Sequence, residues 1–316
     1  MTLFIDNALS PLVLAFVLGF GCQLAGGQLR LADAARDSIA VFLLLAIGLK
    51  GGEALSQAPL RDLSVPLAAT VVAGLATCLS AFAIASGLMK TPRADAAALA
   101  AHYGSASAVT FIAASQFVAD RGDPADGWLS AALAVLEMPA ILLAVLLAKG
   151  RLRGHVRTTL GEVLLSKASV LLLGGLAIGW ISGSTRIEPV MPLFKGLFHG
   201  VLLLYLLDLG ATAAQGIAPV RRSLGRLLPF ALAVPLLHGM MGVSFGHALD
   251  FSQANAAVFG TLVASASYIA APAAVRTSIP EANLPTCVTA ALGITFPFNL
   301  ILGIPLFYWT AGALAG

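Results

Sequence analysis

The sequence predicts an all-α polytopic membrane protein with ten transmembrane helices arranged as two inverted repeats of five. Three observations support this prediction: an apolar composition, a regular series of apolar runs, and a similarity between the two halves. Hydrophobic residues make up 59% and charged residues 10% of the 316 positions, which is too few charges to cover a water-soluble surface of this size. We therefore expect a lipid bilayer around most of the chain. We expect no nucleic-acid partner, because the basic residues form no stripe.

Apolar runs separated by charged, glycine and proline clusters recur along the chain. A helix needs about 20 apolar residues to cross about 30 Å of hydrocarbon, because every backbone amide must be hydrogen-bonded within its own segment. We expect transmembrane helices near 10–29, 35–55, 63–89, 94–119, 128–149, 166–184, 192–215, 224–247, 254–275 and 286–312. Asp6 is the only charge before the first run, so this run is predicted to be a retained helix and not a cleaved signal peptide.

The distribution of basic residues predicts the orientation of these helices. With both termini outside, the inner connections hold 13 of the 18 Lys and Arg residues and the outer side holds five. Cytoplasmic connections of membrane proteins carry the excess of basic residues. We therefore expect a multi-pass protein of the cytoplasmic (inner) membrane with both termini outside. The most basic connection, from Lys149 to Lys167, is then cytoplasmic.

The two halves of the chain resemble each other at one offset of 160 residues. This shift aligns several segments without gaps: Ala94–Ala97 with Ala254–Ala257, Gly104–Ser107 with Ala264–Ser267, Gly19 with Gly179, and Leu49 with Leu209. Because each half contains an odd number of helices, the second half enters the membrane with opposite polarity, as in many secondary transporters. The predicted units are an N-terminal repeat at 1–149, a short basic linker at 150–165 and a C-terminal repeat at 166–316.

The best-matched pair of segments predicts the substrate site. Gly104–Ser107 and Ala264–Ser267 each lie about ten residues into a predicted helix, close to the middle of the bilayer at about 1.5 Å per residue. Small residues allow a helix to unwind, and we expect Ser105 and Ser265 to cap the helices that restart. Two such helix N-termini facing each other would present free amides and hydroxyls to a compact anion. The alternative is a seam of small residues that allows two helices to pack closely.

Polar residues inside predicted helices are candidates for binding a coupling cation, because their burial in a membrane is costly. Glu137 precedes Pro139, and the 160-residue shift places it on Pro297, beside Asn299. Carboxylate, amide and freed carbonyl oxygens are the hard ligands that a sodium ion prefers. Asp208 is a further candidate, and the alternative for each residue is a buried group paired across helices.

Four strings also resemble a known family: Leu45–Gly52, Ala101–Phe111, Ala264–Ala273 and Gly293–Leu300. They are similar to the sodium-dependent bicarbonate transporter family, and the likeness runs through nearly the whole chain. The resemblance implies a ten-helix fold with core and gate domains, a homotrimer, and sodium-coupled bicarbonate uptake with an elevator-like motion. It also implies that the residues around bicarbonate and sodium are Gly104, Ser105, Ala106, Ser107, Thr110, Ser265, Ala266 and Ser267. Ser107 is counted with Glu137, Asn299 and Asp208 as a sodium ligand.

Members of the family in photosynthetic bacteria are regulated by a PII-like trimer that docks on the cytoplasmic side. The central linker of this sequence is short, at about Gly150 to Leu165, whereas the resemblance implies a longer one in those members. The docking of a PII-like regulator is therefore a weaker expectation than transport.

The leading functional hypothesis is sodium:bicarbonate symport into the cytoplasm. A symporter of another small anion, such as a short carboxylate, fits the same site chemistry. A sodium/proton antiporter is disfavoured because no adjacent pair of midplane aspartates is present. An intramembrane serine hydrolase would need a serine with a facing base. Ser105 and His102 form the only nearby pair and have no evident third group, so we do not expect an enzyme.

Overall fold

The computed structural model describes residues 2–57, 60–149, 161, 164–220 and 223–315. Within these residues the chain is helical and contains no strand. The N-terminal half forms α1 (Thr2–Ala8), α2 (Pro11–Leu24), α3 (Asp33–Leu55), α4 (Leu60–Ala83) with the π-helical segment η1 (Ile84–Leu88), α5 (Arg93–Gly104), α6 (Ala108–Ala119) and α7 (Trp128–Lys149).

The C-terminal half begins with α9 (Lys167–Ile187), α10 (Met191–Gly196), α11 (Phe198–Ile217) and the short η2 (Ala218–Val220). It continues with α12 (Leu224–Ala248), α13 (Gln253–Ala264), α14 (Ala270–Ser278) and α15 (Leu284–Val288). The last stretch alternates between π-helical and α-helical geometry, through η3 (Thr289–Thr295), α16 (Phe296–Phe298), η4 (Asn299–Gly303) and α17 (Ile304–Ala315).

Several helices begin at serines that the local sequence provides. The Ser10 side chain accepts from the Val13 amide at the start of α2, where Pro11 occupies the first helical position. Ser166 caps α9 and Ser252 caps α13 in the same way. A serine oxygen satisfies one of the amides that have no partner at a helix N-terminus. These three starts therefore follow from local residue chemistry.

Within the described residues, eight helices are long and apolar enough to cross a membrane. The pair α1 and α2, bent by 55°, would make a ninth. The eight include Arg93–Ala119, which comprises α5 and α6 together, but not the predicted helix 254–275, which is divided into α13, with 12 residues, and α14, with 9 residues. At about 1.5 Å per residue, neither segment alone crosses about 30 Å of hydrocarbon.

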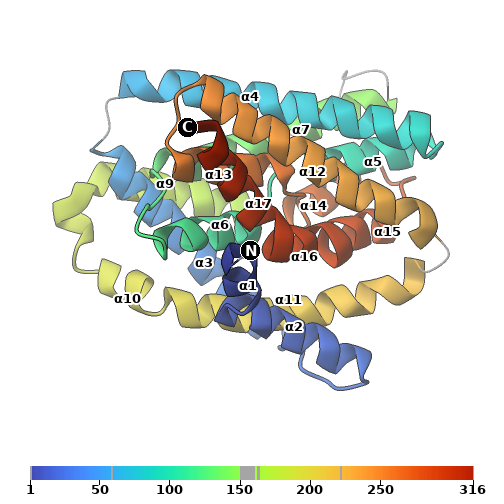
Figure 1. The fold of residues 1–316 in the computed structure, drawn as a ribbon, viewed down its shortest axis with the longest axis horizontal. Coiled ribbons are helices and arrows are strands. Elements are labelled where there is room, and N and C mark those ends of the chain that lie inside the picture. Colours follow the sequence, from blue (N-terminus) through green and yellow to red (C-terminus); the bar gives the residue numbers. More distant parts are fainter. Residues whose placement is uncertain (1, 58–59, 150–160, 162–163, 221–222, 316) are drawn as a thin grey trace.

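The helices form two groups (Figure 1). Helices α2 and α11 pack along each other on one side of the molecule, and α3 packs along α9. On the other side α4 packs with α5 and α7, and α12 packs with α13 and α17. We call α2, α3, α9 and α11 the four-helix group. The broken-helix group consists of α4, α5, α6, α7, α12, α13, α14 and α17. The broken segments α5–α6 and α13–α14 belong to the second group.

The closest contacts in the four-helix group agree with the 160-residue offset. A Cβ atom on Gly19 would collide with the Leu207 carbonyl oxygen in α11, and one on Gly179 would collide with the Leu49 carbonyl oxygen in α3. The offset aligns Gly19 with Gly179, and α3 with α11. Each half therefore supplies a glycine at the same aligned position, and the other half supplies the helix that packs against it.

Candidate functional site

The first helix break lies at Ser105–Ser107, between α5 and α6. Ser105 and Ser107 have extended backbones, with φ/ψ of −107°/161° and −104°/117°. The Ser105 hydroxyl donates to the Ala101 carbonyl oxygen at 2.9 Å and so closes the last turn of α5. The Ser107 hydroxyl oxygen accepts from the Thr110 amide at 3.2 Å and so caps α6. The break therefore joins the end of one short helix to a capped start of another.

The second break lies between α13 and α14. Ser265 has an extended backbone with φ/ψ of −76°/164°, and its hydroxyl donates to the Leu262 carbonyl oxygen at 2.7 Å. The Ser267 hydroxyl oxygen accepts from the Ala271 amide at 3.1 Å, in the first turn of α14. This arrangement repeats that of the first break, with one serine ending a helix and the next serine serving the start of the following helix.

The two breaks are in direct contact. The Ser107 amide donates to the Ser265 hydroxyl oxygen at 2.9 Å, and the Ser267 amide donates to the His102 carbonyl oxygen at 2.8 Å. The structure thus brings together the residues that the sequence predicted around the substrate, and all of them are buried: Gly104, Ser105, Ala106, Ser107, Thr110, Ser265, Ala266 and Ser267.

The prediction that Ser105 and Ser265 cap the restarting helices is wrong. The hydroxyls that serve these helix starts belong to Ser107 and Ser267, two residues further along. The physical reason is the length of the break. The chain needs an extended stretch before it can turn again, so the first serine completes the outgoing helix and only the later one reaches the next helix start.

Gly104 and His102 lie in the last turn of α5, just before the first break. A Cβ atom on Gly104 would lie 2.7 Å from the Cβ atoms of Cys78 and Ala140, so this glycine lets α5 pack closely against α4 and α7. The His102 ring Nδ1 lies 2.8 Å from the Ala98 carbonyl oxygen and can only donate to it, while its Nε2 has no hydrogen-bond partner among the described residues. Since Ser105 donates to Ala101, the two side chains do not pair with each other.

A small cavity lies beside the breaks. Its volume is about 10 Å³, and its walls come from both helix groups: Leu44, Ala106, Ser107, Ala108, Ala168, Ser267, Tyr268 and Ile269. A single water needs about 10–15 Å³ on this scale, so the cavity is too small for a bicarbonate ion. Leu44 of α3 and Ala168 of α9 close it on the side of the four-helix group.

Asn299 lies beside the second break. Its side chain is fully buried, and its Nδ2 donates to the Ala264 carbonyl oxygen, the last residue of α13, at 3.0 Å. Its Oδ1 has no hydrogen-bond partner among the described residues. Asn299 opens the π-helical segment η4, a geometry frequent at functional sites. This amide oxygen could accept a sodium ion.

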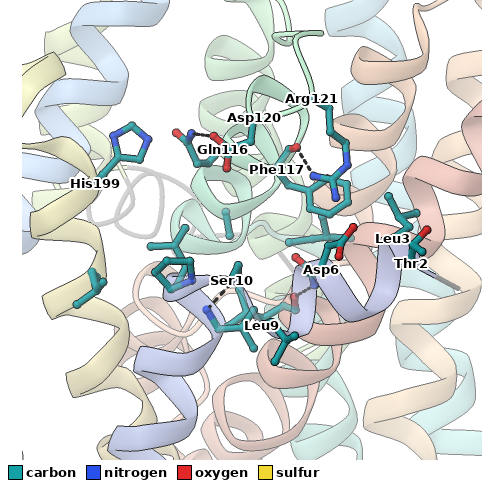
Figure 2. A pocket seen from close by; sticks show the side chains of 18 of the residues that line it. Thr2, Leu3, Asp6, Leu9, Ser10, Gln116, Phe117, Asp120, Arg121 and His199 are labelled. Carbon is teal, nitrogen blue, oxygen red and sulfur yellow. Dashed lines mark hydrogen bonds between the residues drawn. The ribbon is translucent and has the colours of Figure 1, made fainter.

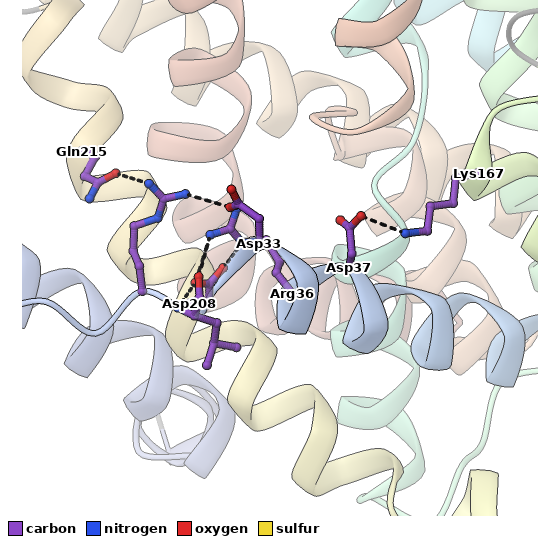
Figure 3. Close-up of polar contacts among 8 residues, drawn as sticks. Asp33, Arg36, Asp37, Lys167, Asp208 and Gln215 are labelled. Carbon is purple, nitrogen blue, oxygen red and sulfur yellow. Dashed lines mark hydrogen bonds and ion pairs between the residues drawn. The ribbon is translucent and has the colours of Figure 1, made fainter.

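The other two predicted cation ligands differ from Asn299. Glu137 belongs to α7, but its side chain falls outside the described residues. Asp208 is fully buried in α11 and lies in an ion-pair network at the start of α3 (Figure 3). Its Oδ2 accepts from Arg36 Nε at 2.6 Å, and its Oδ1 accepts from the Leu31 amide at 2.8 Å. Both carboxylate oxygens of Asp208 thus already have partners, and one partner is a cation.

A larger cavity of about 810 Å³ lies away from the breaks (Figure 2). It is lined by residues from α1, α2, the end of α6, α11 and the η4 region, among them Asp6, Asp120, Arg121 and His199. The Arg121 guanidinium lies over the Phe117 ring, 3.5 Å from its centroid. No break residue contributes to its wall. This cavity is therefore separate from the candidate site.

The sequence patterns did not indicate the roles of three residues near the site. Tyr268 lines the small cavity. Asn7 of α1 donates from Nδ2 to the carbonyl oxygens of Leu300 and Ile301, at 2.9 and 3.0 Å. The Tyr103 hydroxyl lies 2.7 Å from Thr295 Oγ1, which donates to the Ala231 carbonyl oxygen. The position of Tyr268 directly after Ser267 was the sequence signal that could have indicated it. The partners of Asn7 lie almost 300 positions away, and no local pattern indicates them.

The sequence profile of the Na⁺-dependent bicarbonate transporter superfamily matches residues 11–312, which is nearly the whole chain. A comparison with curated proteins gave no match. The family match confirms the resemblance seen in the sequence strings and agrees with the many apolar helices of the structure. The chain therefore belongs to the Na⁺-dependent bicarbonate transporter superfamily.

Proposed function

We propose that this protein imports bicarbonate together with sodium across the cytoplasmic membrane, and that the anion binds where the two helix breaks meet. The observation that carries the proposal is the contact of the breaks through Ser107 and Ser265. The starts of α6 and α14 both contribute to the wall of the adjoining cavity, through Ala108 and Ile269. Helix N-termini carry free amides and a partial positive charge, which favour an anion.

The same proposal assigns the helix topology. The α13–α14 pair forms the tenth crossing, as a broken helix that matches α5–α6 at the 160-residue offset. The two halves are then inverted repeats with both termini outside. The matched glycine contacts of α2 with α11 and of α3 with α9 support this assignment.

The sodium ion binds beside the anion, with Asn299 Oδ1 as one ligand. Its support is the buried oxygen without a partner, next to the last residue of α13. Glu137 and Ser107 remain proposed ligands from the sequence, since Glu137 lies on α7 and Ser107 at the first break. For Asp208 we propose a structural role instead, because Arg36 already neutralises its charge.

Transport requires the two helix groups to move relative to each other. The cavity at the breaks holds about 10 Å³ and is closed by Leu44 and Ala168 of the four-helix group. A bicarbonate ion fits only when these side chains withdraw. This requirement supports an elevator-like motion of a core domain, the broken-helix group, against a gate domain, the four-helix group. A homotrimer held by the gate domains completes the proposal.

Two parts of the proposal rest on the family resemblance. Bicarbonate is preferred over another small anion, such as a short carboxylate, by family membership, since both anions suit paired helix N-termini. A PII-like regulatory trimer would dock on the cytoplasmic side near the 150–165 linker, most of which lies outside the described residues.

Sodium-driven uptake is the direct test. In proteoliposomes with carbon dioxide entry controlled, we expect labelled bicarbonate to accumulate only under an inward sodium gradient, because coupling moves the anion uphill at the expense of that gradient. Potassium outside should not replace sodium. Accumulation that is unchanged after the sodium gradient is collapsed would contradict symport. Uptake of acetate or formate in preference to bicarbonate would select the alternative substrate class.

Replacing Asn299 tests the sodium ligand. We expect Asn299→Ala to raise the sodium concentration for half-maximal uptake by about tenfold or more, because a coordinating oxygen is lost. Asn7→Ala is the matched control, since it removes another buried amide that binds backbone carbonyls of the same region. The control should lower thermal stability and leave the sodium requirement unchanged. A shift of equal size in both variants would assign Asn299 to packing.

A further inference from the structure

A third cavity, of about 330 Å³, lies between the two helix groups on the predicted outer side. Its walls come from α3, α6, the α6–α7 connection and the start of α11. The residues that matter here are Ile47, Lys50, Phe111, Ser115 and Phe198. The cavity is much larger than the one at the breaks and has room for a hydrated small anion.

The polar groups of this cavity favour an anion. Lys50 is half-buried, and its Nζ lies 3.9 Å from the centroid of the Phe198 ring. Lys50 forms no ion pair with any described residue, and the buried Ser115 Oγ has no hydrogen-bond partner among them. Asp126 also lines the cavity, and its Oδ2 accepts from Nδ2 of Asn255 in α13 at 2.7 Å, so this carboxylate is held by α13 and is not paired with Lys50. A lysine without a carboxylate partner and a free hydroxyl are thus available for binding.

The cavity is aligned with the candidate site along two helices. On α3, Leu44 lines the small cavity at the breaks, while Ile47 and Lys50 line the outer cavity. On α6, Ala108 lines the small cavity, and Ser115 lines the outer one. At about 1.5 Å per residue, Lys50 and Ser115 lie roughly 9–11 Å along these helices from the residues that line the small cavity. Ile47 and Phe111, which lie between these positions on α3 and α6, are apolar residues of the outer cavity's wall.

We infer that Lys50 and Ser115 form an access site that binds a small oxyanion from the outside before it reaches the helix breaks. The inference rests on the proposed function, because it assigns a step on the path of the transported anion. Lys50 raises the local anion concentration by its charge, since a cation in a cleft with low-dielectric walls focuses the field there. Its contact with Phe198 holds the ammonium group at the cavity wall. Ser115 supplies a hydrogen-bond donor to the same ion.

A charge series at position 50 tests the inference. In proteoliposomes we would measure kcat/KM for sodium-dependent bicarbonate uptake at fixed sodium, for Lys50→Arg, Lys50→Gln and Lys50→Glu. We expect Lys50→Gln to lower kcat/KM by about tenfold at low ionic strength and Lys50→Glu to lower it further. Lys50→Arg should stay within about twofold of the unmodified protein, because it keeps the charge that creates the field. Ser115→Ala should lower kcat/KM by about fivefold, the effect of one lost hydrogen bond.

The dependence of kcat/KM on ionic strength is a second test, because a residue with only a packing role does not affect this dependence. The unmodified protein should lose part of its kcat/KM when ionic strength rises to physiological values, because the Debye length shortens to about 8 Å. Lys50→Gln should have lost this dependence. Arg186→Gln is the control, since Arg186 is an exposed basic residue of α9 that does not line the cavity. We expect the control to retain full uptake.

The outcomes separate the inference from the proposed function. Equal loss in Lys50→Arg, Lys50→Gln and Lys50→Glu, with the salt dependence retained, would make Lys50 a packing residue and overturn the inference, as would normal kcat/KM in Lys50→Glu. Failure of the proposed function has a different signature: the unmodified protein itself would show no sodium-dependent bicarbonate uptake. If the unmodified protein takes up another small anion with sodium, the same series is measured with that anion. Each variant must first elute as the native oligomer.

Discussion

Ser107→Leu and Ser267→Leu are expected to abolish transport while the protein still inserts and assembles. Both serines line the cavity of about 10 Å³ at the helix breaks. A leucine there would replace the ligand with apolar volume and fill the space that must open between the helix groups. Ser107→Ala and Ser267→Ala remove only one hydroxyl each and leave the backbone amides in place. We expect these alanine variants to weaken bicarbonate binding by roughly 1 kcal/mol.

The order of these effects distinguishes a binding site from a packing seam. If the breaks are only a seam of small residues, the serine-to-alanine substitutions should have almost no effect on bicarbonate affinity. The serine-to-leucine substitutions should then prevent assembly, because the helices can no longer approach closely. Ser244→Leu is the matched control, since Ser244 is exposed on α12 and donates only to the Met240 carbonyl oxygen of its own helix. Bicarbonate affinity and oligomer retention should be measured on the same five variants. Unchanged affinity in every assembled variant would exclude this site.

Asp208→Ala should cause the largest loss of stability among substitutions in the four-helix group. The change leaves Arg36 without its 2.6 Å partner and frees the Leu31 amide. Removing one member of a buried ion pair costs about 3–5 kcal/mol. We expect about 3 kcal/mol because the Arg36 side chain is 22% exposed and water stabilises it partly. The measurement is the thermal unfolding of the detergent-extracted protein.

Comparison with three further variants shows whether Asp208 has a structural role or binds sodium. Asp37→Ala breaks the Lys167–Asp37 pair, whose side chains are 50% and 72% exposed, and should change stability by about 1 kcal/mol or less. Arg36→Ala combined with Asp208→Ala should cost less than the sum of the two single variants, because no unpaired charge remains. If Asp208→Asn instead keeps its stability and raises the sodium requirement, Asp208 contacts the cation.

Positions of helices were predictable because they depend on local residue chemistry. The expected helix 128–149 coincides with α7, and 224–247 differs from α12 by one residue. The first expected helix, 10–29, was less accurate, since α2 ends at Leu24 and α1 precedes it at an angle of 55°. Ser10 and Pro11 begin α2 close to the expected start, and α2 ends before Gly26, whose φ is 85°.

Side-chain partners were not predictable, because they come from residues far apart in the sequence. In the sequence, Asp208 is an isolated acidic residue in an apolar run. Only the packing of α11 against the start of α3 brings Arg36 close enough to form an ion pair with it. In the sequence, Lys50 is a single basic residue toward the end of the expected helix 35–55, and no local pattern indicates its partner. In the structure its Nζ lies over Phe198 at the wall of a cavity.

The sequence alone determined that this is a polytopic helical membrane protein, where most helices lie, and that breaks occur near Ser105 and Ser265. These properties follow from composition and from small residues at matched positions, which act on the backbone locally. The tertiary structure decided that the two breaks touch and that the space beside them is closed. The contacts of Ser107 and Ser267 with the new helix starts are local, whereas the contact between the breaks and the closed space depend on how two distant segments pack against each other.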